Sequence, residues 1–361
     1  MGAIKSTIVG TYPKPKYLMN GVNGRELLDS SGRVFLRIEK ELGSEFKGLV
    51  DRACEGSIRD QEEAGIDIIT DGEQRRDHYI HYVLRHLEGF DYDNMHEKPV
   101  KKLIAGKLTE LYTMLVPRAV SSVTYAGEFL VDDFKFIQSR TTKEIKMCIP
   151  GPATVVDAVQ NDFYSTDRVL AEAYATAINQ EVRALRNAGC KIIQIEDPGL
   201  LRDLSRAEEW GIELLDRCFE GVEGLTTIAH VCCSYPNKRL EAEGITYKSD
   251  KTYYPDLFDL LQASAIDQVS IEAKQTNLSL EALKQLEGKS VILGCIDVGS
   301  ETVETVGNIV AQAEDALKYV RPEQLILGPD CGMLLLSEQA AKAKLTNLEK
   351  AAETLNEMGP L

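Results

Sequence analysis

The chain has 361 residues, of which 43% are hydrophobic, and a formal net charge of −16. A chain of this length can bury a large core, and its negative charge disfavours nonspecific binding to nucleic acid or to anionic lipid. The sequence contains no run near the roughly 18 apolar residues of a membrane span, and its first residues lack the order of a signal peptide. A cytoplasmic enzyme that acts on small molecules is therefore the expectation.

Short runs rich in β-branched residues alternate along the chain with longer amphipathic stretches. Eight such runs occur, at residues 6–12, 66–70, 144–149, 190–196, 225–231, 267–272, 290–296 and 324–329. They are nearly continuously apolar, as is typical of parallel strands that are buried on both faces. The pattern predicts a (βα)8 TIM barrel, with a doubly wound open sheet as the alternative.

Helical periodicity separates most of these runs. The stretch 165–189 begins with a Ser/Thr/Asp capping signal and ends at a glycine. Further helices are expected within 20–64, 279–286, 302–320 and 338–358. Residues 91–140 have no clear period and predict an elaboration that carries either one irregular barrel strand or a hairpin. Because no linker rich in Pro, Gly or Ser interrupts the chain, residues 1–361 are predicted to form a single domain.

Four potential metal ligands lie at the carboxyl ends of three predicted strands. His230 and Cys232 are two residues apart, so their side chains point to the same side of a strand. Glu272 ends the next strand and Cys331 follows the last one, and the ends of barrel strands meet at one rim. Thiolate, imidazole and carboxylate groups are the usual ligands of Zn²⁺. The sequence therefore predicts a zinc site at this rim.

Each of these residues also has a purely structural interpretation. A cysteine is often a small buried apolar group, and His230 could be a hydrogen-bonded core residue. Their joint placement at strand ends favours the metal. The remaining cysteines have no compact disulfide spacing, so they are expected to be reduced core residues: Cys54, Cys148, Cys190, Cys218, Cys233 and Cys295.

A sulfur-rich zinc site favours the activation of a thiol. Zinc that takes a substrate thiol as an additional ligand lowers the pKa of that thiol, and the resulting thiolate can be alkylated. Hydrolysis by a zinc-bound hydroxide is commoner with histidine-rich sites, because thiolates weaken the metal as a Lewis acid. A structural or metal-buffering zinc protein is the non-enzymatic alternative.

Seven sequence blocks, in one order and across nearly the whole chain, resemble the catalytic barrel of the cobalamin-independent methionine synthase family. They are STIVGTYPKP (6–15), IITDGEQRRD (68–77), PGPATV (150–155), IIQIEDPGL (192–200), IAHVCCSYPN (228–237), VSIEAKQTN (269–277) and LILGPDCGM (325–333). The resemblance implies zinc ligands at His230, Cys232, Glu272 and Cys331, the same set that the strand ends predict.

The resemblance also implies a site for the amino-acid end of homocysteine. The turn after the first strand corresponds to Gly10 and Thr11, and two acids correspond to Glu73 and Glu196. Two carboxylates suit an ammonium group, although Glu73 could instead be a helix-start carboxylate. This chain has I-E-D-P where the family has I-D-E-P, so Glu196 reaches one methylene further and Asp197 one less.

Three departures from the family pattern bear on the methyl donor. The sequence lacks the additional amino-terminal barrel of the folate-dependent enzymes. Ala158 stands near the position of the family's pterin-stacking tryptophan, and Trp210 is interpreted as packing. Gly299 replaces the family's candidate proton-donor histidine, while Asp297 remains. Asp297 and Asp197 are therefore the candidate catalytic acids. The donor is left open, with a corrinoid protein as one candidate.

Two basic segments adjoin the expected amino-acid site. Residues 75–86, RRDHYIHYVLRH, are interpreted as a solvated helix face. The alternative is that Arg75, Arg76 or His78 faces an anionic group of the substrate. Lys14 and Lys16 could likewise bind a carboxylate or a sulfonate.

The sequence thus predicts a zinc-dependent thiol alkyltransferase that methylates homocysteine to methionine by in-line attack of a thiolate on an activated methyl group. Thiol addition to an epoxide, as in epoxyalkane:coenzyme M transferases, is the alternative reaction. Barrels of the uroporphyrinogen decarboxylase type are disfavoured, because they need no such zinc site. The expected partners are small molecules and a methyl donor, and neither nucleic acid nor a membrane is expected.

Overall fold

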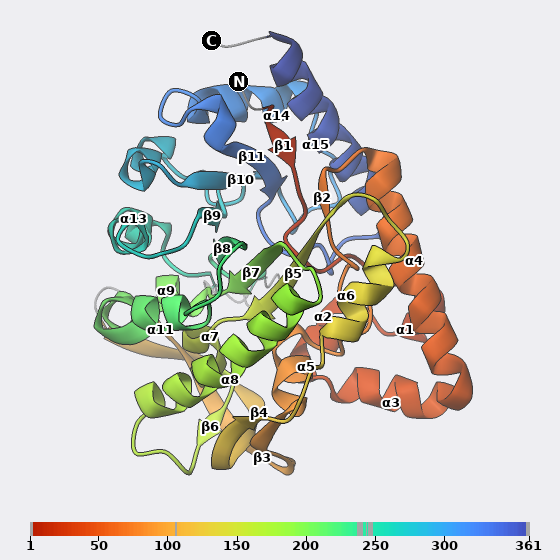
Figure 1. Cartoon of the computed structure of the whole chain (residues 1–361), viewed down its shortest axis with the longest axis vertical. Helices are drawn as coiled ribbons and strands as arrows, with labels where there is room; N and C mark the ends of the chain where they lie inside the picture. The colour runs from red at the N-terminus through yellow and green to blue at the C-terminus, as the bar shows by residue number, and fades with distance from the viewer. Residues whose placement is uncertain (1–2, 105–106, 237–240, 243, 245–247, 359–361) are drawn as a thin grey trace.

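Eight parallel strands form a closed barrel at the centre of the molecule (Figure 1). The computed structural model describes residues 3–104, 107–236, 241–242, 244 and 248–358. The sheet has the order β1-β11-β10-β9-β8-β7-β5-β2, and a parallel bridge between Thr7 and Ile68 joins its two outer strands. The barrel strands are β1 (Lys5–Ser6), β2 (Ile68–Ile69), β5 (Glu144–Pro150), β7 (Ile192–Glu196), β8 (Thr226–Val231), β9 (Gln268–Ile271), β10 (Ser290–Ile296) and β11 (Leu325–Pro329). The predicted (βα)8 barrel is confirmed, and every predicted run overlaps one of these strands.

The interior of the barrel changes from apolar to polar along the strands. At the amino ends, isoleucines from five strands pack together: Ile68, Ile192, Ile228, Ile292 and Ile326. Alternate residues share one face of a strand, so Gln194 and Glu196 follow Ile192 on the inner face of β7. His230 and Cys232 follow Ile228 in the same way on β8. Polar groups and the candidate metal ligands are thereby gathered at the carboxyl ends.

The strand β2 is short because a helix side chain takes over its pairing. Gln61, near the end of α4 (Phe46–Ala64), accepts a hydrogen bond from the Thr70 amide at 3.0 Å and donates to the Thr70 carbonyl at 2.9 Å. A side-chain amide thus replaces the ladder beyond residue 69. This arrangement ties the turn that follows β2 to the outer layer of helices.

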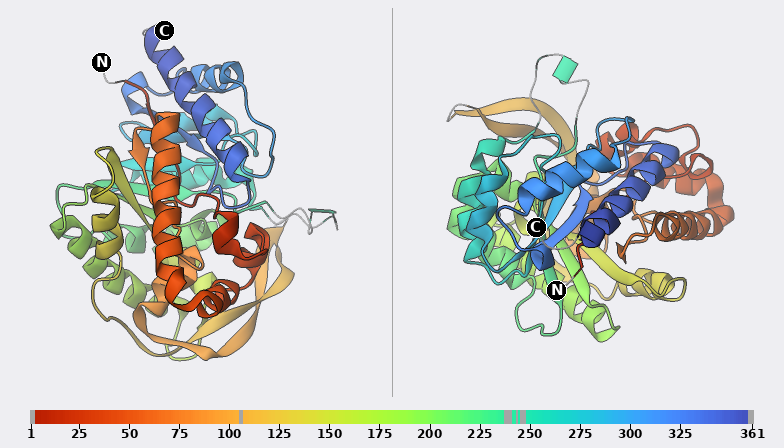
Figure 2. Two further views of the ribbon diagram at one scale, coloured as in Figure 1. Left: turned by 90° about the vertical axis from the view of Figure 1, so that its right-hand side faces the viewer. Right: turned by 90° about the horizontal axis from the view of Figure 1, so that it is seen from above.

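Helices surround the barrel (Figures 1 and 2). The predicted stretch 165–189 forms α8 (Asp167–Asn187), whose N-cap is Thr166, and 338–358 forms α15 (Glu338–Met358). Residues 302–320 contain α14 (Val306–Ala316), whereas 279–286 forms the 3-10 helix η4 (Leu280–Leu286). The other long helices are α3 (Arg33–Leu42), α4 (Phe46–Ala64), α6 (Val131–Gln138) and α13 (Tyr254–Gln262).

Several short helices complete the outer layer. They are α1 (Lys16–Met19), α2 (Gly24–Asp29), η1 (Gly43–Glu45), α5 (Tyr79–Arg85), α7 (Pro152–Asp157), α9 (Gly199–Arg202), α10 (Leu204–Arg206), η2 (Ala207–Gly211), α11 (Ile212–Arg217), η3 (Lys251–Tyr253) and η5 (Pro322–Gln324). Trp210 lies in η2 and packs into the main core, as expected. Within the described residues, no helix has the length and apolar character needed to cross a membrane.

The segment of unclear period forms a long hairpin. Strand β3 (Leu87–Ile104) pairs antiparallel with β4 (Lys107–Tyr125), and β4 pairs in parallel with β6 (Gln160–Asn161). The pairing shifts register at three places, between Glu88 and Phe90, between Asp91 and His96, and at Val100. Each shift interrupts the two-residue alternation of a strand. The hairpin interpretation is therefore confirmed, and none of the described residues of this segment forms a barrel strand.

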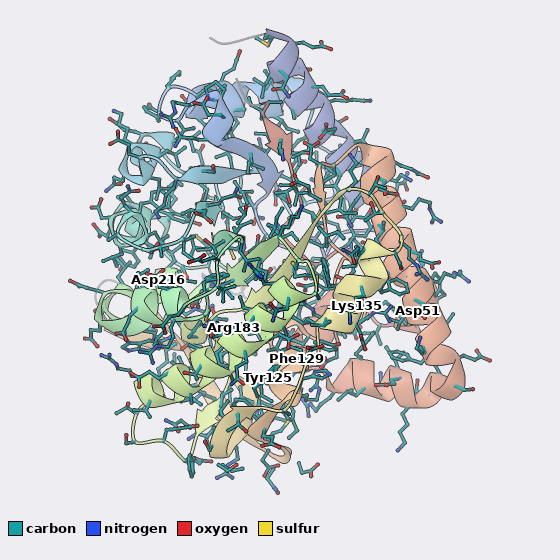
Figure 3. All side chains as sticks on the ribbon, in the orientation of Figure 1. Asp51, Tyr125, Phe129, Lys135, Arg183 and Asp216 are labelled. Carbon is teal, nitrogen blue, oxygen red and sulfur yellow. The ribbon has the colours of Figure 1, made fainter. Side chains whose placement is uncertain are left out.

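The base of the hairpin is attached to α8. Glu181 of α8 accepts hydrogen bonds from the Tyr125 hydroxyl at 2.7 Å and from the Leu130 amide at 2.6 Å. Tyr125 and Phe129 lie beside α8 in Figure 3. The hairpin therefore extends from a fixed base, and its far part reaches across one end of the barrel (Figure 2).

Candidate active site and metal centre

A histidine and two cysteines meet at the carboxyl ends of β8 and β11. His230 lies near the end of β8, Cys232 follows that strand, and Cys331 follows β11. Their ligand atoms all lie within 4.8 Å of one another, and the two Sγ atoms are 3.5 Å apart. All three side chains are buried. These residues are called the His–Cys–Cys cluster below.

His230 presents a free nitrogen to this cluster. Its Nδ1 lies 2.9 Å from the Ser270 hydroxyl of β9, whereas its Nε2 is buried and has no hydrogen-bond partner among the described residues. Buried polar atoms rarely lack a partner. Metal-binding histidines commonly use one ring nitrogen for the metal and the other for a hydrogen bond. The two nitrogens of His230 therefore fit a metal site.

The pKa values of the two thiols of the cluster shift in opposite directions. The Cys331 thiol hydrogen bond holds the pKa of Cys232 well below its ordinary value, and His230 adds to this effect against the penalty of burial. The same hydrogen bond, together with burial, raises the pKa of Cys331. This hydrogen bond thus favours the charged form of Cys232 and the protonated form of Cys331, and a soft cation would favour loss of the second proton.

The fourth predicted ligand, Glu272, is not part of this cluster. Its side chain is buried, and both oxygens are engaged elsewhere. Oε1 accepts a hydrogen bond from Lys248 Nζ at 2.6 Å, and Oε2 accepts one from the Cys233 amide at 3.0 Å. Burial lowers the pKa of Lys248, but the attraction of Glu272 outweighs this effect and raises it. The structure therefore places Glu272 in an ion pair beside the cluster.

The predicted amino-acid site forms a second cluster at the same rim. Glu73, Cys148 and Glu196 have ligand atoms within 4.8 Å of one another, and all three are buried. Glu73 Oε2 accepts a hydrogen bond from the Thr11 hydroxyl at 2.6 Å. A Cβ atom on Gly10 would stand only 2.9 Å from Glu73 Oε1 and 3.1 Å from Glu196 Oε1. The structure thus brings all four predicted substrate residues together. It also shows why residue 10 is a glycine, because a side chain there would crowd the two carboxylates.

Two buried cations stabilise this acid cluster. Arg76 donates to Glu73 Oε1 at 3.0 Å. Lys146 donates to Gln194 Oε1 at 2.9 Å, and Gln194 in turn donates to Glu196 Oε1 at 3.1 Å. Burial and the neighbouring Glu73 raise the pKa of Glu196 to about 8, against the opposing effects of Arg76 and Lys146. An ammonium group bound here would favour the charged form of both acids.

The prediction of a solvated helix face for residues 75–86 is wrong. Arg76, His78 and His81 are buried, and α5 turns its apolar residues toward the core. His78 caps α5 by accepting the Ile80 amide at its Nδ1, so in the neutral ring the proton is on Nε2. Helix periodicity did not reveal the burial of Arg76 and His78, because polar contacts hold these two side chains in place.

Of the two candidate lysines beside this site, one donates hydrogen bonds to backbone carbonyls. Lys14 is buried and donates to the carbonyls of Glu73 and Gln74 at 3.0 and 2.8 Å. It therefore shapes the loop that carries Glu73. Lys16 is exposed at the start of α1.

The two candidate catalytic acids lie apart from both clusters. Asp197 accepts hydrogen bonds from the amides of Ala153 and Thr154 and from the Thr154 hydroxyl. It therefore holds the first turn of α7, and burial raises its pKa to about 7. Asp297 accepts the Gly299 amide at 2.7 Å. Neither residue is among those that line the main pocket, so the geometry gives no support to a catalytic role for them.

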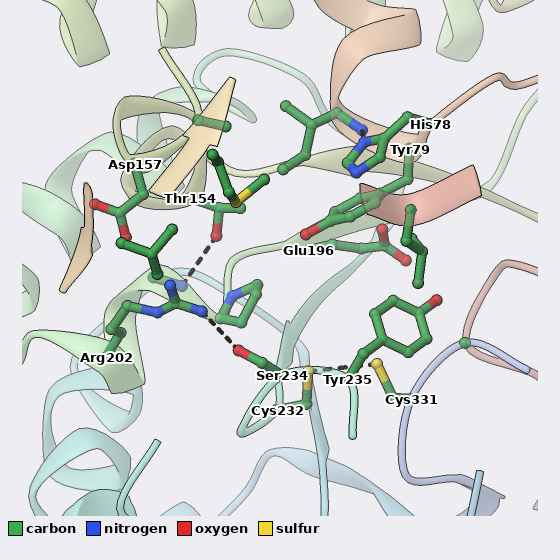
Figure 4. A pocket seen from close by; sticks show the side chains of 18 of the residues that line it. His78, Tyr79, Thr154, Asp157, Glu196, Arg202, Cys232, Ser234, Tyr235 and Cys331 are labelled. Carbon is green, nitrogen blue, oxygen red and sulfur yellow. Dashed lines mark hydrogen bonds between the residues drawn. The ribbon is translucent and has the colours of Figure 1, made fainter. Parts of the chain in front are cut away.

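A pocket of about 370 Å³ connects the two clusters with the hairpin. Cys232, Cys331 and Glu196 line its inner part, and Figure 4 shows Tyr235 beside the two sulfurs. The hairpin contributes Lys98, Pro99, Val100, Lys101 and Met114, and the segment from α7 to α10 contributes Thr154, Asp157, Ala158, Arg202 and Arg206. A volume of this size suits a small organic molecule rather than a macromolecule.

Three residues of the site escaped the sequence analysis. Ser270 stands two residues before Glu272 on the same strand face, so strand alternation could have identified it. Tyr235 lies in one of the matching blocks, and its hydroxyl would be 2.2 Å from a Cβ on Gly332. Lys248 lies in an irregular segment after that block, where no pattern marks it.

The remaining cysteines are buried and unpaired, as expected. Cys148 differs from the others because it joins the acid cluster. Ala158 lines the pocket. At Gly299 a Cβ atom would stand 2.4 Å from Gln275 Nε2, so the glutamine occupies the space beside it.

Comparison with known proteins gives one consistent result. Residues 7–354 match the family model described as the catalytic domain of cobalamin-independent synthase. A methionine synthase of Sulfurisphaera tokodaii is 29% identical over 98% of this chain and 93% of its own length. A methionine synthase of Saccharolobus islandicus is 31% identical over 98% of this chain and 95% of its own length.

The solved structures agree with the sequence matches. A B12-independent methionine synthase from Shewanella sp. W3-18-1, solved in complex with selenomethionine, superimposes with a TM-score of 0.86 at 31% identity. The match covers 99% of both chains. A protein from Listeria monocytogenes, described as a putative vitamin-B12 independent methionine synthase, shares the fold with a TM-score of 0.69 at 18% identity.

Proposed function

The chain belongs to the cobalamin-independent methionine synthase family and is a methyltransferase, and we propose that it methylates homocysteine with the help of a zinc ion. The ion would be held by His230, Cys232 and Cys331. The methyl group would come from a separate donor that enters the pocket from the hairpin side.

One observation carries the metal assignment. His230 Nε2 is buried, has no hydrogen-bond partner among the described residues, and lies within 4.8 Å of two cysteine sulfurs. Two sulfurs and an imidazole are a soft donor set that suits zinc. Zinc, when bound there, supplies a Lewis acid that lowers the pKa of a substrate thiol toward neutral pH.

The acid cluster supports an amino acid as the thiol substrate. Glu73 and Glu196 offer two carboxylates to an ammonium group, and charge-assisted hydrogen bonds of this kind are strong. The similar Shewanella protein was solved with selenomethionine, a methionine analogue. Because both clusters line or adjoin one pocket, an amino acid anchored by its ammonium group could direct its sulfur to the His–Cys–Cys cluster.

The protein residues would then act by orientation. Glu73 and Glu196 fix the amino-acid end, while Thr11 and Arg76 hold Glu73 in place. The thiol loses its proton, and the thiolate attacks the methyl carbon in line. The sulfur–carbon bond forms as the bond between the methyl group and the donor breaks, and the leaving group keeps the electron pair. Holding both reactants in one pocket supplies much of the acceleration.

The same geometry argues against the two alternatives. Coenzyme M carries a sulfonate, which two buried carboxylates would repel. A structural zinc site is closed by four protein ligands, whereas the His–Cys–Cys cluster offers three and opens on a pocket. Both arguments depend on the acid cluster and the pocket rather than on the metal itself.

Calorimetric titration tests the proposal. L-homocysteine and coenzyme M would be added separately to zinc-loaded wild-type protein, to zinc-free protein and to the Glu73→Gln variant. We expect homocysteine to bind only to zinc-loaded protein, with release of a proton, and to bind more weakly to the variant. Preference for coenzyme M would move the assignment to epoxide chemistry, and binding of neither thiol would refute a thiol substrate.

A further inference from the structure

The proposed function gives no role to the basic side chains that line the pocket outside the two clusters. Five such side chains and four acids line this part: Arg25, Lys98, Lys101, Arg202 and Arg206, and Asp29, Asp157, Asp167 and Asp203. Arg25 pairs with Asp29 at 2.7 Å. Arg206 pairs with Asp157 at 2.8 Å and with Asp203 at 3.8 Å. Two cations thus account for three of the acids, and the fourth acid, Asp167, is exposed to solvent.

Lys98 reaches from the hairpin to the end of α7. Its Nζ donates to the carbonyls of Val156 and Val159 at 2.6 Å each. These two residues flank Ala158, which also lines the pocket. Burial lowers the pKa of Lys98 against the attraction of nearby acids, and no acid among the described residues lies within ion-pair distance of its ammonium group. A partly buried ammonium that is held by neutral carbonyls favours an anionic partner.

Arg202 lies at the end of α9, and its guanidinium is tied to the metal centre through one residue. Its Nη2 donates to the Ser234 hydroxyl at 2.8 Å. Ser234 has a left-handed backbone, with a φ of 84°, and a hydrogen bond from its amide contributes to the low pKa of Cys232. Figure 4 shows Arg202 meeting Ser234 beside Cys232. An anion held by Arg202 would therefore have a fixed position relative to the reacting sulfur.

The carboxylate of the amino-acid substrate does not account for these cations. Figure 4 shows Arg202 and Glu196 on different sides of the pocket. In an amino acid the carboxylate and the ammonium group are bonded to the same carbon. A substrate whose ammonium group lies at the acid cluster therefore keeps its carboxylate away from Arg202. The molecule that reaches Arg202 is then the second substrate.

We propose that Arg202 and Lys98 form a subsite for an anionic group of the methyl donor. The donor would be a small organic molecule with a carboxylate or a phosphate group, since a guanidinium binds both in a bidentate manner. It shares a pocket of about 370 Å³ with the amino acid. The chain as a whole has a net charge of −16 and repels anions, so binding of such a donor depends on local cations.

The subsite acts by positioning, because it holds the donor at the end away from the methyl group. In-line transfer requires the methyl carbon to lie about 3–3.5 Å from the attacking sulfur. The identity of the anion as the methyl donor rests on the proposed function. The presence of an anion subsite does not, because it follows from the pocket and its charges alone.

The test titrates inorganic phosphate and acetate into the protein, with and without saturating L-methionine, at constant ionic strength. Phosphorus NMR follows phosphate, and saturation-transfer proton NMR follows acetate. The variants are Arg202→Met, Arg202→Lys and Lys98→Met. Arg183→Met is the matched control, because Arg183 also donates to neutral groups, the carbonyls of Glu220 and Gly221, but lies on the outer helix α8. Thermal unfolding shows that each variant is folded.

We expect Arg202→Met to weaken binding of the preferred anion at least about tenfold, because charge-assisted hydrogen bonds are lost. Lys98→Met and Arg202→Lys should each weaken it about threefold, and Arg183→Met should stay within about twofold of the wild type. L-methionine should leave the affinity unchanged, since it occupies the acid cluster. Tighter binding of phosphate than of acetate would indicate a phosphate-bearing donor, and the reverse order a carboxylate.

Two results would overturn the proposal. One is equal behaviour of Arg202→Met and wild type toward both anions, including a failure of both proteins to bind either. The other is displacement of the anion by L-methionine, because the cations would then belong to the amino-acid site. The titration needs neither zinc nor a thiol, so a failure of homocysteine to bind would count against the proposed function alone.

Discussion

The barrel rim and the hairpin build opposite sides of one pocket in different ways. The rim consists of the His–Cys–Cys cluster and the acid cluster, whose residues are buried and lie at strand ends or in the turns that follow them. The hairpin side, here called the roof, consists of Lys98, Pro99, Val100, Lys101 and Met114. These roof residues lie on an irregular two-stranded ribbon and are more exposed. The rim thus holds its reactive groups in fixed positions, whereas the roof is suited to selecting the second substrate, the methyl donor.

The largest expected effect concerns the rim. Removal of a residue that hydrogen-bonds to a metal ligand, without touching the metal, typically weakens metal binding by roughly 10–100-fold. Cys331→Ser removes a proposed ligand itself, so it should weaken zinc binding by more than this. Methyl transfer should be lost with the metal. Ser270→Ala is the comparison variant, because the Ser270 hydroxyl contacts His230 at Nδ1, the ring nitrogen that would not bind the metal. Equal zinc affinity in Cys331→Ser and wild type would contradict the assignment of the metal to this cluster.

The second effect separates the two clusters of the rim. Glu73→Gln should weaken homocysteine binding about 10–100-fold, since one charge-assisted hydrogen bond to the ammonium group is lost. Zinc affinity should be unchanged, because Glu73 belongs to the other cluster. Measurement of both dissociation constants on one preparation checks this. A parallel loss of zinc would mean that the two clusters form a single unit.

The third effect depends on pH. The pKa of Glu196 is raised on folding from 4.5 to about 8. Its contribution to the free energy of unfolding is therefore fully present below pH 4.5 and is lost as the pH rises through about 8. Glu196→Gln has no such proton to lose, so its melting temperature relative to wild type should rise between pH 5 and pH 9. The rise should be about 2–4 °C for each kcal/mol of unfolding free energy that the wild type loses over this range. A difference that does not vary with pH would mean that Glu196 is not perturbed.

The smallest effect belongs to the roof. Met114→Ala removes part of the apolar wall of the pocket, and kcat/KM for the methyl donor should fall about fivefold. Zinc and homocysteine affinities should stay at the wild-type values. Should homocysteine affinity fall instead, the roof would contact the first substrate, and the division between rim and roof would not hold.

The sequence predicted the rim far better than the roof, for a physical reason. Barrel strands are nearly continuous apolar runs, and the residues at their carboxyl ends must converge, so His230, Cys232 and Cys331 were found together. The hairpin could only be given as one of two alternatives, because its register shifts remove the alternation that marks a strand. The exposed face expected for residues 75–86 was wrong, since Arg76 and His78 are buried by polar contacts that no periodicity reveals.

The pairing of Glu272 was also beyond the reach of the sequence. Its position at the end of a strand was predicted, and that part of the prediction agrees with the structure. Its partner, Lys248, lies more than twenty residues away in an irregular segment. A strand end specifies where a side chain starts but not which of two neighbours it contacts.

The order in which the barrel closes has a consequence for how the protein is made. The first strand pairs with the last, and the Asn356 side chain bonds both backbone groups of Ile4. On the ribosome, β1 therefore waits for its partner until β11 has been synthesised. Cys331 follows that last strand, so a nascent chain that stops short of it contains only two residues of the His–Cys–Cys cluster. Closure of the barrel and completion of the cluster thus both depend on the synthesis of the last barrel strand and the residues just after it.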